Sequence, residues 1–139
     1  MIDERALDAL VDEMRTKAMT SGTPVGVVHG YIARCPTAAL VADDAGYYVA
    51  ANAAALALTG FSREELLERS VSDLTAPGDA AVEERLWNSF VRSDRQRGSY
   101  SLRRKDGSIV HVRYEAYASV APGVHVSFLT PLERGGERE

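Results

Sequence analysis

Apolar residues at the start of the chain recur at helical spacing. Between Ile2 and Met19 they fall three or four positions apart, and charged side chains fill most of the intervening positions. This pattern predicts an amphipathic helix with one apolar face. Turn-forming residues from Thr20 to Pro24 then end the pattern.

Short apolar runs predict two strands directly before a pair of helices. The runs 39–42 and 47–51 flank Asp43-Asp44-Ala45-Gly46, which indicates a hairpin with a tight turn. Asn52 and Gly60 then stand where a helix N-cap and a left-handed C-terminal residue are expected. Ser62 and Glu65 have the spacing of a capping box at the start of the next helix.

Period-two alternation predicts three more strands after residue 99. Asp106-Gly107 and Pro122-Gly123 supply the turns between them. The alternation places Val112, Tyr114, Val126 and Phe128 on the core side of the sheet. It places the two histidines of these strands, His111 and His125, on the opposite side, outside any interior pocket.

These elements define an α+β fold class. We expect a five-stranded antiparallel sheet with helices packed on one face, plus the N-terminal amphipathic helix. The chain has 139 residues, of which 45% are hydrophobic, and this is enough for a single core. The expected division is an N-terminal helix and linker over 1–24, one domain over 25–132 and a polar tail over 133–139.

Charge and cysteine content exclude several classes of protein. The net charge of -4, with acids and bases interleaved, argues against nucleic-acid binding. The longest apolar runs fall well short of the roughly 20 residues that span a membrane. One cysteine, Cys35, and no Cys/His cluster argue against a metal site and favour a reducing, cytoplasmic location.

Several short motifs, in this order and spacing, resemble the PAS domain family over about Val28 to Pro131. They are Pro36-Thr37-Ala38, Asp43-Asp44-Ala45-Gly46, Ala51-Asn52-Ala53-Ala54, Thr59-Gly60-Phe61-Ser62-Arg63-Glu64-Glu65-Leu66-Leu67, Pro77-Gly78-Asp79 and Arg103-Arg104-Lys105-Asp106-Gly107-Ser108. The resemblance implies a curved sheet around a small interior that holds a ligand or cofactor. It also implies a homodimer, and signals passed through flanking helices to an output domain or partner protein.

The same resemblance disfavours two cofactors. Relatives that bind haem usually hold the iron with a histidine on the helix matched here by 80–91, and this segment contains none. Relatives that form a flavin adduct use a cysteine in the segment that reads Ser70-Val71-Ser72-Asp73 here, where Val71 replaces the thiol. The adjacent acids Asp43 and Asp44 fit a hairpin turn better than a catalytic pair, so we expect no enzyme.

An apolar and aromatic set is expected to form most of the core and the walls of any pocket. Tyr100 and Tyr114 are its first polar groups to consider, because a buried phenol needs a hydrogen-bond partner. The sequence leaves open whether this core is solid or contains a cavity. The full set is Leu56, Leu58, Phe61, Leu74, Leu86, Trp87, Phe90, Tyr100, Leu102, Val112, Tyr114, Val126 and Phe128.

The N-terminal apolar stripe has two interpretations. It either folds back on its own sheet or pairs with the same helix of a second chain, and the size of the patch favours the dimer. Its residues are Ile2, Leu7, Leu10, Val11 and Met14. The leading hypothesis is a sensory domain that binds a small molecule and signals through dimer or partner contacts. The alternative is a dimerisation or protein-interaction module without a ligand.

Overall fold

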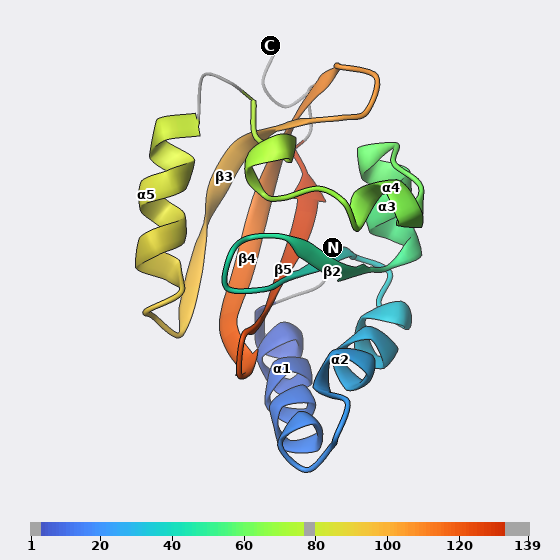
Figure 1. The fold of residues 1–139 in the computed structure, drawn as a ribbon, viewed down its shortest axis with the longest axis vertical. Coiled ribbons are helices and arrows are strands. Elements are labelled where there is room, and N and C mark those ends of the chain that lie inside the picture. Colours follow the sequence, from blue (N-terminus) through green and yellow to red (C-terminus); the bar gives the residue numbers. More distant parts are fainter. Residues whose placement is uncertain (1–3, 77–79, 133–139) are drawn as a thin grey trace.

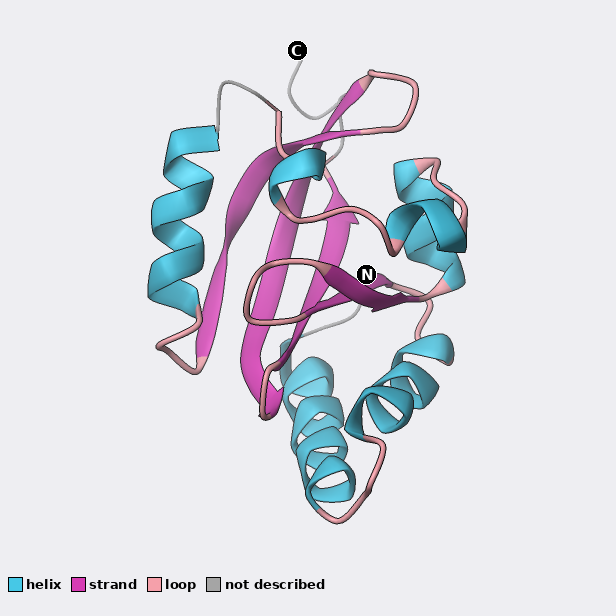
Figure 2. Ribbon diagram, viewed as in Figure 1, coloured by secondary structure: helices cyan, strands magenta, loops and turns pink. Residues whose placement is uncertain are grey.

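A five-stranded antiparallel sheet forms the centre of the molecule in a computed structural model that describes residues 4–76 and 80–132 (Figures 1 and 2). The strand order across the sheet is β2-β1-β5-β4-β3, which confirms the expected sheet. The strands are β1 (Ala38–Ala42), β2 (Tyr48–Ala51), β3 (Arg95–Arg103), β4 (Ile109–Ala121) and β5 (Val124–Pro131). Three expected features lie outside the described residues: Ile2, Pro77-Gly78-Asp79 and the tail 133–139.

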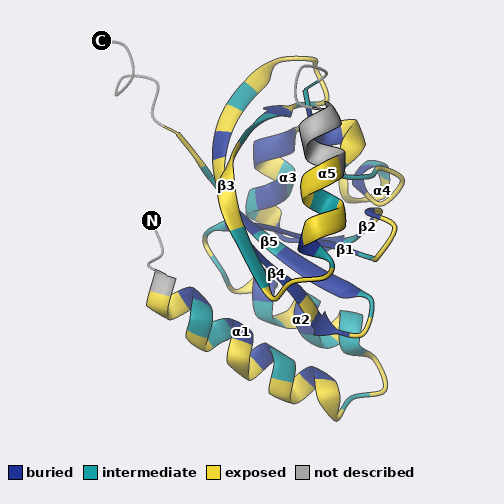
Figure 3. Cartoon of the chain, turned by 90° about the vertical axis from the view of Figure 1, so that its left-hand side faces the viewer, coloured by how far each residue is buried: buried dark blue, intermediate teal, exposed yellow. Residues whose placement is uncertain are grey.

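Helices pack on both faces of this sheet (Figure 3). The helices α3 (Ala53–Thr59), α4 (Arg63–Leu66) and α5 (Ala80–Phe90) and the 3₁₀ turn η1 (Ser72–Leu74) lie on the inner, concave face. The predicted N-terminal helix, α1 (Glu4–Met19), is present and packs with α2 (Pro24–Ala33) on the opposite, outer face. The arrangement therefore adds a second covered face to the one that the sequence predicted.

Local sequence signals explain how the first half of the inner layer begins and ends. Asn52 is 2% exposed, and its Oδ1 accepts hydrogen bonds from the backbone N–H groups of Ala39 and Ala55, both at 3.0 Å. Its Nδ2 donates to the carbonyl oxygens of Ile32 and Thr37, both at 2.9 Å. One buried amide therefore caps α3 and also ties it to β1 and α2.

The next helix start is a capping box, as its sequence predicts. Ser62 Oγ accepts from the Glu65 N–H at 3.2 Å, and Glu65 Oε1 accepts from the Ser62 N–H at 2.9 Å. Lys105 Nζ lies 2.6 Å from Glu65 Oε2 and donates to it. The hydrogen bonds from Lys105 and Ser62 lower the pKa of Glu65 to about 2, so this carboxylate stays ionised at neutral pH.

The α1 stripe is covered by the chain's own sheet. Leu7, Val11 and Met14 are only 2%, 1% and 0% exposed and pack in one cluster with β1, β4 and β5. Leu10 is partly buried against the same cluster. The fold-back arrangement therefore removes these described side chains from water, and a dimer through them would require α1 to leave its own sheet.

Polar contacts at the edges of this packing fix the position of α1. The Tyr117 hydroxyl donates to Asp8 Oδ1 at 2.9 Å, and Arg15 Nη2 donates to the Ala118 carbonyl at 3.1 Å. Burial, and secondly the bond to Asp8, raise the pKa of the Tyr117 phenol, because both favour its neutral form. The helix is held by hydrogen bonds as well as by apolar contact.

The side-chain directions on β5 differ from the sequence prediction. Val126 and Phe128 pack against the α1 cluster on the outer face, while His125 borders the inner cavity and Leu129 belongs to the inner core. The expected core-side placement of Val126 and Phe128 beside Val112 and Tyr114 is wrong. The physical reason is that α1 and α2 need an apolar surface to cover, and these two large side chains supply it.

Candidate functional site

A cavity of about 180 Å³ lies between the concave face of the sheet and α5. It is partly open to solvent, and most of the surface that lines it is apolar. Its walls come from β1, β2, the segment around η1, α5, β3, β4 and β5. The lining residues are Leu40, Ala42, Tyr48, Val71, Thr75, Leu86, Trp87, Phe90, Gln96, Ser99, Tyr100, Tyr114, Ala116, His125, Val126 and Ser127.

Small side chains on the central strands create the floor of this cavity. The register brings Leu40, Ser127, Ala116 and Gln96 into one row across β1, β5, β4 and β3. The two middle positions are Ser127 and Ala116, whose short side chains leave space beneath α5, although Ala116 belongs to one buried cluster with Phe90. Ser127 is only half-buried although it lies on a central strand. The small size of these side chains therefore explains the cavity above the central strands.

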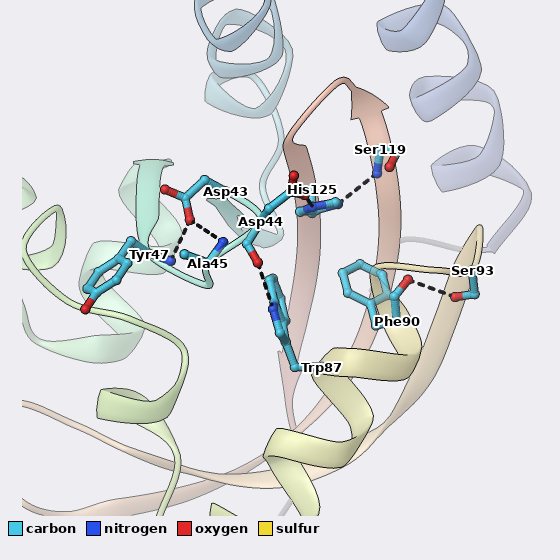
Figure 4. A network of polar contacts seen from close by, with 9 residues as sticks. All are labelled: Asp43, Asp44, Ala45, Tyr47, Trp87, Phe90, Ser93, Ser119 and His125. Carbon is cyan, nitrogen blue, oxygen red and sulfur yellow. Dashed lines mark hydrogen bonds and ion pairs between the residues drawn. The ribbon is translucent and has the colours of Figure 1, made fainter.

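Aromatic rings on α5 form the roof. The ring centroids of Trp87 and Phe90 lie 5.5 Å apart, and each lies within 5.7 Å of the His125 imidazole centroid. The Trp87 indole N–H donates to the Asp44 carbonyl oxygen at 3.2 Å (Figure 4). At Gly46, where φ is +89°, a Cβ atom would lie 3.7 Å from this indole, so Trp87 packs directly over the β1–β2 turn.

His125 connects the cavity to two loops. It is 2% exposed, and its Nδ1 accepts the backbone N–H of Ser119 at 2.8 Å (Figure 4). Because Nδ1 acts as an acceptor, the ring proton is on Nε2, which donates to Asp44 Oδ1 at 2.7 Å. Both nitrogens of this buried imidazole are thus engaged in hydrogen bonds.

Two tyrosines, from β3 and β4, form another wall of the cavity. The rings of Tyr100 and Tyr114 meet edge to face with centroids 5.7 Å apart, and Gln96 Nε2 donates to the Tyr114 hydroxyl at 2.9 Å. A Cβ atom at Gly98 would lie 3.3 Å from the Tyr114 ring and hydroxyl. Glycine at this position of β3 therefore leaves room for the phenol to lie across the strand.

The structure divides the predicted pocket residues into three groups. Leu86, Trp87, Phe90, Tyr100, Tyr114 and Val126 border the cavity, although the Val126 side chain belongs to the α1 cluster. Leu56, Leu58, Phe61, Leu74, Leu102 and Val112 fill the adjoining solid part of the inner core. The prediction of Phe128 as a pocket residue is wrong, because Phe128 lies on the opposite face, where α1 covers it.

The polar part of the site differs from what the sequence pattern predicted. His125 was expected outside the pocket and instead borders it, whereas His111 is exposed and lies 2.9 Å from Ser101 Oγ through its Nδ1. Asp44 lies in the predicted turn with its side chain 73% exposed, and its Oδ1 also accepts a hydrogen bond from His125. Leu129 shares the parity of His125 and is core, but Val126 and Phe128 give the opposite parity an equally apolar pattern, so alternation alone does not place His125.

The cavity walls have no fixed charge at any described position. Asp, Glu, Lys and Arg do not occur among the lining residues that the structure places. Within residues 4–76 and 80–132, no three His, Cys, Asp or Glu side chains gather as a metal site would require. Cys35 packs at the edge of the α1 and α2 cluster, on the other side of the sheet from the cavity.

Comparisons with known proteins define the class of this fold. The family model described as PAS domain matches residues 36–129, and the chain belongs to this family. PAS domains are sensory and generally non-enzymatic modules, and their fold is typical of signal-transduction sensors. Among curated proteins, none matches the chain in sequence.

Solved structures with the same fold come from several sources. The PAS domain of a protein from Colwellia psychrerythraea has a TM-score of 0.66 and 18% identity, covering 78% of this chain and 96% of that chain. A domain of a sensory box sensor histidine kinase/response regulator from Geobacter sulfurreducens has a TM-score of 0.65 and 17% identity, covering 76% and 91%. A LOV protein from Rhodobacter sphaeroides has a TM-score of 0.66 and 16% identity, covering 81% and 68%. At these identities the likeness establishes the fold alone.

No described helix combines the length and the apolar character needed to cross a membrane.

Proposed function

We propose that this chain is a sensory domain that binds a small molecule in the cavity under α5 and transmits its occupancy to a partner surface. The observation that carries the proposal is the cavity itself. It lies on the concave face of the sheet, and it is bounded by aromatic rings. Apolar pockets with a few convergent polar groups are the usual sites for small ligands.

A chain of hydrogen bonds supports a route from the cavity to the outer face. The His125 ring borders the cavity and accepts the Ser119 N–H, and Ser119 has a φ of +53° where the β4–β5 pairing shifts register. The preceding carbonyl, that of Ala118, accepts Arg15 from α1. A ligand that displaces His125 would change the strained backbone to which α1 is attached.

The same ligand would act on α5. Trp87 joins the cavity roof to the β1–β2 turn through the Asp44 carbonyl, and His125 reaches the side chain of that same aspartate. Asp44 is thus the point where the roof, the turn and β5 meet. We propose that signalling passes from α1 or α5 to an output domain or partner protein in the cytoplasm, including through a homodimer that uses surfaces other than the covered α1 stripe.

The proposal is tested on freshly purified protein. Native mass spectrometry reports a retained molecule, and thermal unfolding against a small-molecule library reports one that binds. A compound class that raises Tm in the wild type and loses its effect in Ala116→Leu, which fills the cavity floor, is the expected result. Exchange of the Ser119 amide hydrogen with and without that compound tests the route to α1.

The alternative function is a protein-interaction module that works without a ligand. It predicts no retained molecule, no stabilising compound and an unchanged partner affinity in Ala116→Leu. An enzymatic function is not proposed, because both ring nitrogens of His125, the histidine at the cavity, are engaged in structural hydrogen bonds. An enzymatic function would require a measurable turnover that is lost when Asp43, Asp44 or His111 is changed.

A further inference from the structure

We infer that the cavity selects an uncharged, single-ring molecule that carries one hydroxyl or similar polar group, held by the Ser127 hydroxyl. This inference rests on the proposed function and adds the chemistry of the ligand. Three independent features of the described residues carry it: the size of the cavity, the lack of charge in its walls and the hydrogen-bonding capacity that the walls leave unused.

Size sets the first limit. The cavity measures about 180 Å³. Pockets for drug-sized ligands span about 300–1,000 Å³, whereas an apolar cavity of about 150 Å³ engineered into another protein binds benzene. The space below α5 therefore suits one six-membered ring with a small substituent, and it is too small for a fused-ring cofactor without movement of α5.

Charge sets the second limit. None of the described lining residues is Asp, Glu, Lys or Arg. The single lining histidine, His125, has both nitrogens engaged, one by Ser119 and one by Asp44. A carboxylate or ammonium group entering this cavity would lose its water and find no countercharge among the described lining residues, which strongly disfavours binding. A neutral ring loses little hydration free energy on entering the cavity, and it gains contact with Trp87, Phe90 and Tyr114.

The third feature identifies the polar anchor. The Thr75 hydroxyl donates to the Val71 carbonyl at 2.9 Å, and the Tyr114 hydroxyl accepts from Gln96. Within the described residues, the Ser127 hydroxyl has no hydrogen-bond partner, and it lies half-buried at the centre of the cavity floor. A ring hydroxyl above Ser127 would give and accept a hydrogen bond that the protein leaves unmade.

Three probes of nearly equal shape test this chemistry by calorimetry and by their effect on Tm at neutral pH: phenol, benzene and benzoate. Phenol is expected to bind more tightly than benzene, and benzoate is expected not to bind. In Ser127→Ala, phenol affinity is expected to fall about three- to tenfold, toward that of benzene, because one neutral hydrogen bond is lost. Benzene affinity is expected to be unchanged in this variant, which serves as the internal control.

Cavity-filling variants locate the binding. Ala116→Leu on β4 and Ala42→Leu on β1 fill the floor from two strands, and each is expected to abolish binding of phenol and benzene. Circular dichroism is the control for folding. Loss of binding in a variant that folds reflects the filled space.

Each contrary outcome has a distinct meaning. Benzoate binding as tightly as phenol, or phenol affinity unaffected by Ser127→Ala, overturns the assigned ligand chemistry and leaves the sensory proposal standing. The same holds if all three probes fail while a library compound of another class binds and is lost in Ala116→Leu. If no compound binds the wild-type protein, the proposed function fails and this inference fails with it.

Discussion

The two faces of the sheet are built from the same strands but differ in how completely they are packed. On the outer face, Phe128, Val41 and Ala39 meet α1 and α2 in a cluster with residue exposures near zero. On the inner face, Ala116 and Ser127 leave the space below α5 unfilled. Successive side chains of a strand point to opposite faces of the sheet. A difference in side-chain size at neighbouring positions therefore gives one tightly packed face and one face with space for a ligand.

The largest expected difference between the faces comes from removing a phenyl ring. Phe128→Ala, on the outer face, is expected to lower the free energy of unfolding by about 3–5 kcal/mol. Phe90→Ala is the matched change on the inner face, where the ring is 4% exposed and also borders the cavity. It is expected to cost at least about 1 kcal/mol less, because a ring beside a void has fewer contacts to lose. Urea unfolding measures both, and equal losses would mean that the inner face is as well packed as the outer.

Adding volume should have opposite effects on the two faces. Ala39 is fully buried on the outer face, and Ala39→Leu is expected to cost about 1–3 kcal/mol because the extra carbons have no space. Ala116→Leu places the same carbons in the cavity and is expected to leave the free energy of unfolding unchanged or to raise it. A clear destabilisation by Ala116→Leu, measured by the same unfolding experiment, would show that the cavity closes in solution.

A smaller effect tests the polar attachment of α1 to the outer face. Tyr117→Phe removes the hydrogen bond to Asp8 and is expected to cost about 1–2 kcal/mol at neutral pH. Since the folded protein raises the pKa of this phenol above its usual value of 10.0, its contribution is complete below about pH 10 and is lost as the pH rises through the folded value. Wild type and variant should therefore converge in stability at high pH.

Tyr31→Phe is the control for this experiment. The Tyr31 hydroxyl also binds α1, donating to Glu13 Oε2 at 2.9 Å, but this contact is exposed. Its loss is expected to cost less than that of the Tyr117 hydroxyl. The assignment of Tyr117 as an anchor of α1 fails if the two variants have the same unfolding free energy and the same pH profile.

The smallest expected change concerns the inner face. Asp44→Asn weakens the contact with His125 Nε2, and because the Asp44 side chain is 73% exposed, the cost is about 0.5 kcal/mol or less. The more informative measurement is Trp87 fluorescence, because Trp87 is the single tryptophan and binds the backbone of the same aspartate. A shifted emission spectrum with nearly unchanged stability is the expected outcome. An unchanged spectrum would mean that the turn and the roof are not coupled.

Local signals predicted the fold well. Asn52, Gly60, Ser62 and Glu65 act as caps in the structure as their spacing indicates, because a cap depends only on residues a few positions away. The order of these elements and the alternation in the later strands then predicted the five-stranded antiparallel sheet, which the structure confirms. The presence of α1 was equally predictable from its spacing, while its packing partner was not, since a stripe of apolar residues carries no information about what covers it.

The polar site could not be predicted because it depends on register between distant segments. His125 meets Asp44 only because β5 pairs with β1 so that Ala42 lies opposite His125. Its other partner, Ser119, is turned toward it where the β4–β5 pairing shifts register before Ala121. On β5, apolar residues occur on both faces, so alternation alone could not decide which set points to the cavity.

The position of β3 at the edge of the sheet limits how the protein can associate. Near its C-terminal end, the edge is capped by the Thr75 bridge to Leu102 and by the Ala76 N–H bonded to the Ser101 carbonyl. Toward its other end, the strand carries Arg95 and Arg97. Charged side chains on an edge strand oppose the addition of a strand from another molecule. The sheet is thereby protected against continuous edge-to-edge growth, which would otherwise lead to aggregation at high concentration.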